Sequence, residues 1–144
     1  MGKVNLFFET FRDVEIDDYT IVRLKCGVQF KTKRGWSQPY SAIVDTGAHT
    51  SVIPLSLWKE MVHDKIQRYK IFGISKQEGC SILGNIGKVT LIIVDENGNQ
   101  TKELEICAFL AETDQIPLII GFNGLLEKLK VNFDFRKNEA SVED

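Results

Sequence analysis

The chain has 144 residues, of which 43% are hydrophobic and 26% charged, and its formal net charge is −2. A chain of this length and balance can bury one ordinary core, which argues against a disordered or repetitive protein and favours a single domain. The small net charge argues against a general affinity for nucleic acid, and no apolar stretch approaches membrane-spanning length. The sequence therefore predicts neither a nucleic-acid nor a membrane partner.

The beginning of the chain, from Met1 to Glu9, lacks an apolar core long enough for a signal peptide, and Leu6 stands where a myristoylation motif requires Ser or Thr. Cys26, Cys80 and Cys107 are odd in number and have no Cys-x-x-Cys spacing, which argues against a disulfide framework or a zinc site. We therefore expect a cytoplasmic protein that needs no metal or other cofactor.

Strand periodicity dominates the first third of the chain. Between residues 20 and 30, one side of a predicted long strand carries Thr20, Val22, Leu24, Cys26, Val28 and Phe30. The other side carries polar groups, including Arg23, Lys25 and Gln29. The basic run from Lys31 to Gly35 that follows predicts a solvated hairpin turn rather than a nucleic-acid site.

The most informative motif is Asp45-Thr46-Gly47-Ala48, which lies between the apolar runs Tyr40 to Val44 and Thr50 to Pro54. This context predicts a strand, a sharp turn and a second strand, with one carboxylate at the turn. Such a carboxylate can perform acid–base chemistry beside a like carboxylate, because the two cannot both ionise and come to share one proton. The chain has no second Asp-Thr-Gly or Asp-Ser-Gly, so a catalytic Asp45 needs its partner from another copy of the chain.

Two helices and further strands are expected downstream. Pro54 at a first-turn position predicts a helix whose buried face holds Leu55, Trp58, Met61 and Val62. Residues 71 to 81 place glycines around a polar centre and predict a hairpin, either an ordinary surface hairpin or a mobile one. Strands are expected at 89–94 and 102–110, joined at Asn97-Gly98.

A second motif lies some seventy residues after Asp45. Residues 117 to 126 read as an apolar strand, a turn at Gly121 and the start of a helix of about residues 123 to 129, with Leu125, Leu126 and Leu129 facing inward. Residues 131 to 135 alternate like a strand. The charged residues 136–144 are expected to be a disordered tail, which leaves residues 1–135 as the domain.

The motifs Asp-Thr-Gly-Ala, Ser-Val-Ile-Pro, Ile-Ile-Gly-x-Asn-x-Leu-Leu and Asn-Phe-Asp-Phe occur in this order between about residues 40 and 135. Together they resemble the retropepsin-like aspartic proteases. The resemblance implies a mostly-β, closed-barrel-like domain with two short helices, and a homodimeric enzyme that cleaves peptide or protein substrates. Retroviral members of the family also interleave their chain termini, but residues beyond Phe135 look too charged for a buried strand.

The resemblance also implies roles for individual residues. Asp45 would be catalytic, the Thr46 hydroxyl would bond across the two-fold axis, and Gly47 would permit close approach of the substrate backbone. Substrate would be bound by Ala48, His49, Val52, Gly73, Ile74, Pro117 and Ile119. In this assignment Gly73 and Ile74 belong to the flap, a hairpin that folds over bound peptide and excludes water.

Two positions depart from the retroviral pattern. Retroviral members carry an acidic residue after Asp-Thr-Gly-Ala and an arginine after the glycine of the second motif, and these two form an ion pair. Here the positions hold His49 and Phe122, so the dimer must be braced differently.

Three functions are compared on the sequence. An aspartic endopeptidase is favoured, because the alternative, a dimeric peptide-binding module on the same fold, has no need of costly like-charged carboxylates. A phosphate-handling Asp nucleophile is weaker still, since no basic, glycine-rich phosphate cradle accompanies Asp45.

Overall fold

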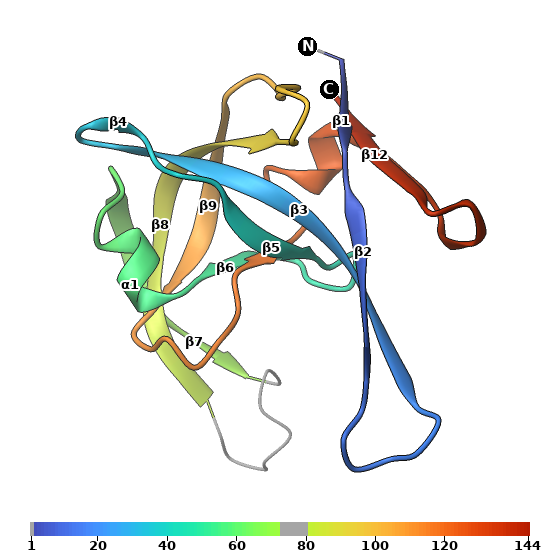
Figure 1. Ribbon diagram of the computed structural model, residues 1–144. Coiled ribbons are helices and arrows are strands. Elements are labelled where there is room, and N and C mark those ends of the chain that lie inside the picture. The colour runs from blue at the N-terminus through green and yellow to red at the C-terminus, as the bar shows by residue number, and fades with distance from the viewer. Residues whose placement is uncertain (1, 73–80) are drawn as a thin grey trace.

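The computed structural model describes residues 2–72 and 81–144, and it is built almost entirely of β-strands (Figure 1). The first half contains β1 (Lys3–Asn5), β2 (Phe7–Arg12), β3 (Thr20–Thr32), β4 (Gly35–Trp36), β5 (Tyr40–Val44), β6 (Ser51–Ile53), α1 (Leu55–Trp58) and β7 (Asp64–Phe72). The second half contains β8 (Ser81–Val94), β9 (Leu104–Ala111), β10 (Ile119–Ile120), the 3₁₀ turn η1 (Leu126–Lys128), β11 (Lys130–Asp134), the 3₁₀ turn η2 (Phe135–Lys137) and β12 (Glu139–Glu143). The predicted mostly-β fold is confirmed.

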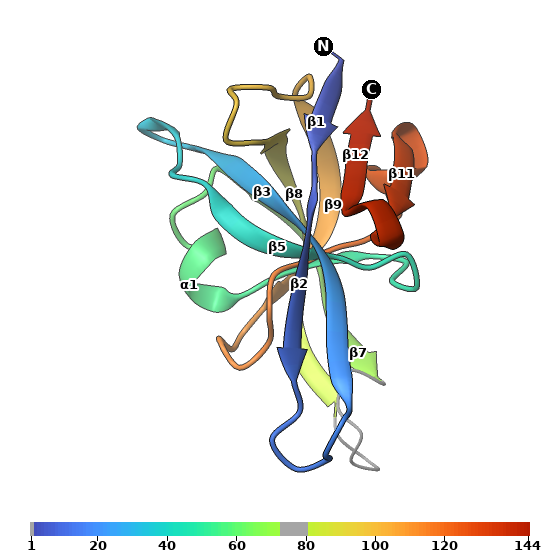
Figure 2. The same ribbon diagram turned by 45° about the vertical axis from the view of Figure 1, so that its right-hand side comes forward.

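The strands of the described residues form two sheets. The larger sheet has the order β2-β3-β5-β10-β6-β9-β8-β7, with β4 paired to β3. A further pairing joins β8 back to β3. The strands β3, β5, β10, β6, β9 and β8 are therefore paired in a closed ring around the main core. The smaller sheet has the order β1-β12-β11 and lies beside the larger one (Figure 2).

The main core fills the ring. Cys26, Val28 and Phe30 of β3 are fully buried, as the alternation along this strand predicts. The alternation does not bury the start of the strand, where Val22 is 45% exposed, because residues 20–25 pair with β2 outside the ring. Burial also raises the pKa of the Cys26 thiol to about 12, against a smaller opposing effect of Lys25.

Two glycines of β8 allow this strand to pack closely against side chains of the neighbouring strand β9. A Cβ on Gly84 would lie 2.3 Å from the carbonyl oxygen of Leu110 and 2.7 Å from Cζ of Phe109. A Cβ on Gly87 would lie 2.6 Å from Cδ1 of Leu110. The absence of side chains at these two positions therefore makes room for Phe109 and Leu110 of the paired strand β9.

Both predicted helices are shorter than expected. After α1 the chain forms an isolated bridge between Met61 and Thr32, and the Val62 amide donates to the Lys31 carbonyl over 3.0 Å. This pairing with β3 ends the helix and leaves Val62 47% exposed, so its predicted burial is wrong. In the second segment Gly124 has φ +74°, which is outside the right-handed helical region, and only η1 follows it. Leu125 and Leu126 are nevertheless buried as predicted.

The prediction of a disordered tail at residues 136–144 is wrong. Residues 139–143 form β12, which pairs antiparallel with both β1 and β11. Val142 is fully buried between Val4 and Val131, while the glutamates at both ends of the strand point away from the core. The segment thus forms a strand despite its high charge, because its apolar residues alternate with polar ones and lie on one face. One chain therefore pairs its own terminal strands, without a strand from a second copy between them.

Asp95 organises the turn between β8 and β9. Its carboxylate accepts the amides of Asn97 at 2.9 Å and Asn99 at 3.0 Å, and also the amide of Asn5 at 2.9 Å, which ties the turn to β1. Partial burial alone would raise the pKa of Asp95, but these hydrogen bonds together hold it below its ordinary value. The predicted Asn97-Gly98 turn is therefore part of a wider loop, with Gly98 at φ +82°.

Within the described residues, no helix is both long and apolar enough to cross a bilayer.

Candidate active site

Asp45 is the first residue after β5, and hydrogen bonds fix its position on both sides. Its amide donates to the Ile120 carbonyl of β10 over 3.0 Å, and the Ala48 amide donates to the Asp45 carbonyl over 3.2 Å. Its carboxylate oxygen Oδ1 accepts the Gly47 amide at 2.8 Å. The carboxyl group is half-buried, so it is held in a defined orientation while one side stays open to solvent.

Gly47 leaves space beside the Asp45 carboxylate and does not adopt an unusual backbone angle. Its φ is not in the left-handed region, but a Cβ there would lie only 3.2 Å from Oδ1 of Asp45. A side chain would therefore press on the carboxylate that the Gly47 amide binds.

The second motif is locked into this turn. β10 lies between β5 and β6, parallel to the first and antiparallel to the second, so that Ile119 is paired with both Ile43 and Val52. The Gly121 amide then donates to the buried Ser51 hydroxyl over 2.9 Å. A Cβ on Gly121 would lie 2.7 Å from the carbonyl oxygen of Ala48, so only glycine allows the two loops to pack this closely.

Backbone hydrogen bonds join the loop after Asp45 to the loop after Gly121. The Phe122 amide donates to the Ala48 carbonyl over 3.0 Å, and the Asn123 amide donates to the His49 carbonyl over 2.8 Å. The two loops are therefore braced by their main chains, which explains how His49 and Phe122 can stand at these positions within one chain.

An apolar row crosses the sheet below the Asp45 turn. Directly paired residues share one face of a sheet, and the strand registers connect Ile43 through Ile119, Val52 and Phe109 to Ile86. Asp45 follows Ile43 by two residues, so by strand alternation it lies toward the same face. The members of the row other than Ile43 pack with Ala111 and Ile116 into a second, smaller hydrophobic cluster.

The structure brings most of the predicted site residues together, with different exposures. Thr46, Gly47 and His49 are exposed, Ala48 and Ile119 are half-buried, and Pro117 is exposed at the start of the second motif. Val52 is only 3% exposed, so almost none of its side chain is open to solvent. Gly73 and Ile74 lie outside the described residues, although the strands β7 and β8 that lead to them pair up to Phe72 and Ser81.

Sequence reasoning did not place Ile86, Phe109 and Ile116 in the hydrophobic cluster beside the Asp45 turn. Alternation along a strand indicates burial but not the neighbour against which a residue is buried. The registers that pair Val52 with Phe109, and Phe109 with Ile86, supply that information for two of them.

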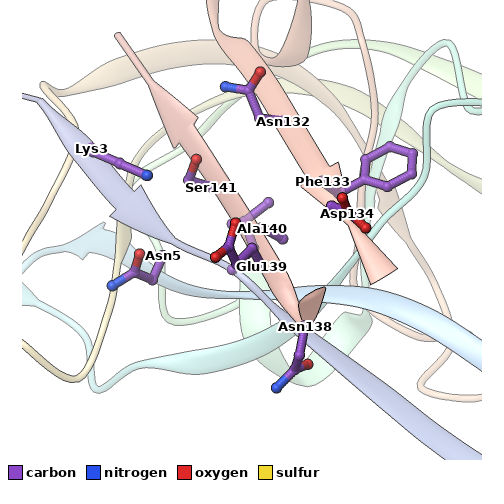
Figure 3. A pocket seen from close by; sticks show the side chains of 10 residues that line it. Lys3, Asn5, Asn132, Phe133, Asp134, Asn138, Glu139, Ala140 and Ser141 are labelled. Carbon is purple, nitrogen blue, oxygen red and sulfur yellow. The ribbon is translucent and has the colours of Figure 1, made fainter. Parts of the chain in front are cut away.

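Two cavities lie elsewhere on the chain, and neither has Asp45 in its lining. One of about 540 Å³ is formed at β1, β12 and β11 by mostly polar side chains, including Lys3, Asn132 and Glu139 (Figure 3). The other, of about 550 Å³, lies against the Asp95 turn. Among the described side chains, no three from His, Cys, Asp and Glu are grouped so that they could hold a metal ion.

By sequence, the chain matches no protein-family model and no curated protein. By structure, it is similar to a retropepsin-like aspartic protease from Rickettsia conorii, with a TM-score of 0.51 and 13% identity over 99% of this chain and 90% of that one. The fold is retropepsin-like. A second similar structure is the EIAV protease complexed with the inhibitor HBY-793, with a TM-score of 0.42 and 20% identity over 77% of this chain and 86% of that one.

In the retropepsin-like fold of this chain, the two sequence motifs form neighbouring loops. In this chain they are the two loops joined by Ser51, Gly121 and the brace at Ala48 and His49. The likeness to these structures concerns the fold alone.

Proposed function

We propose that the protein is a homodimeric aspartic endopeptidase in which two Asp45 carboxyls, one from each subunit, activate a water molecule. The observation that carries the proposal is the Asp45 turn itself, since its carboxylate is oriented by the Gly47 amide and its loop is locked to the second motif. A rigidly held carboxylate at an open turn suits acid–base chemistry, which depends on positioning.

The proposed mechanism needs both copies of Asp45. One carboxylate is ionised and takes a proton from the water between them, while the other is protonated and donates to the carbonyl oxygen of the scissile bond. No covalent intermediate and no metal ion enters these steps. Because Asp45 lies at a turn that is partly open to solvent, we propose that the peptide cleft is completed when two subunits meet.

The apolar row supports an apolar peptide as substrate. Ile119 and the buried Val52 lie beside the Asp45 turn, and Pro117 is exposed at its edge. An extended peptide would place apolar side chains against Ile119 and Pro117, while Ala48 and His49 flank its backbone. Gly73 and Ile74 would close over it from the predicted flap.

The Thr46 hydroxyl is proposed to stabilise the dimer. Thr46 is exposed in the single chain, and in the proposed dimer it would bond across the two-fold axis to the partner's matching loop. Thr46→Ala should therefore shift sedimentation at micromolar concentration toward the monomer. A wild-type protein that stays monomeric at high concentration would count against the enzyme.

The decisive variant is Asp45→Asn, which keeps size and shape but removes the ionisable group. We expect the wild type to cleave extended apolar peptides from a library, followed by mass spectrometry at pH values from roughly 3 to 8, a range that brackets shared-proton carboxyl pairs. Activity should be highest at acidic to mildly acidic pH and fall when both carboxyls ionise. Statine-type peptides should inhibit, and metal chelators and thiol or serine reagents should not.

Asp45→Asn should abolish cleavage and leave the fold intact, and loss of the like-charge repulsion can raise its melting temperature. The rival proposal is a dimeric peptide-binding module on the same fold. It gains support if the wild type cleaves nothing while wild type and Asp45→Asn bind the same peptides equally. We also propose that the protein acts in the reducing cytoplasm, consistent with the free thiols of Cys26 and Cys107.

A further inference from the structure

A two-stranded arm extends beyond the body of the protein. We define the arm as residues 7–25, in which β2 pairs with the first half of β3 from Phe7 opposite Lys25 to Arg12 opposite Thr20. Figures 1 and 2 both show it projecting downward from the larger sheet. We define the arm tip as residues 12–19, which connect the two strands.

The arm tip has a defined shape. The Asp13 carboxylate accepts the amides of Glu15 at 2.8 Å and Ile16 at 3.0 Å, and the Asp13 amide donates to the Tyr19 carbonyl over 2.9 Å. Asp18 adopts the left-handed conformation at φ 62°. The turn is therefore pre-organised by local hydrogen bonds, which lowers the entropy cost of binding through it.

The surface of the arm tip is both apolar and acidic. The side chains of Val14, Ile16 and Tyr19 are 99%, 55% and 53% exposed. The hydrogen bonds of the turn therefore hold apolar side chains in contact with solvent. Four carboxylates and one arginine lie between residues 12 and 19, which gives the tip a net charge of −3. Of these, Arg12 and Asp18 are 3.5 Å apart, and Glu15 and Asp17 are exposed.

The other end of β3 has the opposite character. The basic hairpin, residues 31–36, joins β3 to β4 and carries Lys31, Lys33 and Arg34, a net charge of +3. The Thr32 hydroxyl shapes its turn by donating to the Gly35 carbonyl over 2.7 Å and accepting the Arg34 amide at 3.1 Å. Trp36 is 40% exposed beside these cations.

These two surfaces cannot meet within one chain, because they lie at opposite ends of a 13-residue strand that spans roughly 40 Å. Figure 1 shows β4 and the arm tip on opposite sides of the molecule. We propose that the arm tip of one chain binds the basic hairpin of a second copy, so that two chains related by a two-fold axis make this contact twice.

The position of the arm supports a reciprocal contact. Lys25, near the middle of β3, is paired with Ile43, two residues before Asp45. A two-fold axis that brings each arm tip to the other chain's basic hairpin passes near the middle of β3, and hence near the Asp45 turn. The contact therefore rests on the dimer proposed above, but it does not depend on peptide hydrolysis.

Charge reversal tests the contact. Glu15→Lys with Asp17→Lys makes the arm tip basic, and Lys33→Glu with Arg34→Glu makes the basic hairpin acidic. Each pair should raise the dimer dissociation constant at least about tenfold in sedimentation at low salt, because each change acts at two symmetric contacts. Added salt should weaken the wild-type dimer in the same direction.

The variant that carries all four changes gives the most specific test of the contact. It restores opposite charges at both contacts, with a net charge of +1 on the arm tip facing −1 on the basic hairpin in place of −3 facing +3. Its dissociation constant should therefore fall several-fold below that of either reversal alone, which also rules out misfolding as the cause. The charge-matched control Glu96→Lys with Glu105→Lys changes exposed carboxylates outside both surfaces and should leave association unchanged.

The outcomes separate this inference from the proposed function. The arm contact is overturned if neither charge reversal changes the dimer dissociation constant. It is also overturned if the variant with all four changes dimerises no better than the single reversals. Neither result bears on cleavage by Asp45. A wild-type protein that remains monomeric at low salt would overturn it as well. Recovery in the fourfold variant together with no cleavage of any peptide would keep the contact and count against the protease.

Discussion

Replacing Ser51 with alanine removes the side chain that ties the two motif loops together. Its hydroxyl oxygen accepts the Gly121 amide at 2.9 Å, and Ser51 is fully buried. The substitution leaves that amide buried without its partner, at a cost of about 1–3 kcal/mol. The change in side-chain volume is small, so the lost hydrogen bond should dominate the effect.

This cost translates into a measurable change in melting temperature. For a chain of this length the unfolding entropy is about 0.3 kcal/mol per kelvin, so the melting temperature of Ser51→Ala should fall by about 3–10 °C. Differential scanning calorimetry of both proteins at neutral pH measures it directly. Ser41→Ala is the matched control, because Ser41 lies on the neighbouring strand β5 but is exposed.

The reasoning is refuted if Ser51→Ala melts at the same temperature as Ser41→Ala. That result would mean that the Gly121 amide finds another acceptor at no cost, and that the two loops do not depend on this bond. A loss of stability without loss of compactness, measured by small-angle scattering, would support the local origin of the effect.

Three further predictions follow from the packing and the pKa shifts. Gly84→Ala should destabilise the fold by at least about 1–3 kcal/mol in urea denaturation, since its Cβ would lie 2.3 Å from the Leu110 carbonyl oxygen. Asp95 has a lowered pKa in the folded state, so its stabilising effect is present above its ordinary pKa and is lost as the pH falls through the lowered value. The difference in melting temperature between wild type and Asp95→Asn should therefore shrink as the pH falls below the ordinary value of 3.8, and a difference that stays constant in acid would contradict the assignment. Cys26, with a pKa of about 12, should resist thiol reagents at neutral pH in the native protein and react after unfolding, which mass spectrometry of labelled peptides resolves.

The β core could be predicted from the sequence because its signals are local. The alternation that buries Cys26, Val28 and Phe30 is read along a single strand, and the Asp45 turn is marked by the apolar runs on both sides of it. The pairing of the two motifs was anticipated only through the family resemblance. No local pattern indicates that the Gly121 amide reaches the Ser51 hydroxyl.

The errors arose where a long-range contact decided the outcome. Helical periodicity around Trp58 predicted a longer α1, but the bridge between Met61 and Thr32 redirects the chain into the sheet. The tail was misread because Glu139 and Glu143 suggested solvation. Its strand forms because β1 and β11 both offer open edges to Val142, and edges cannot be seen in a linear sequence.

The position of β12 between β1 and β11 separates folding from association. In a dimer whose terminal strands are exchanged, each subunit completes its fold only with the other, so stability depends on protein concentration. Here the chain satisfies its own terminal edges, and a single copy can be fully folded. A protease built on such a subunit would be silenced by dilution alone, and its activity would rise steeply with local concentration while the subunit itself stayed intact.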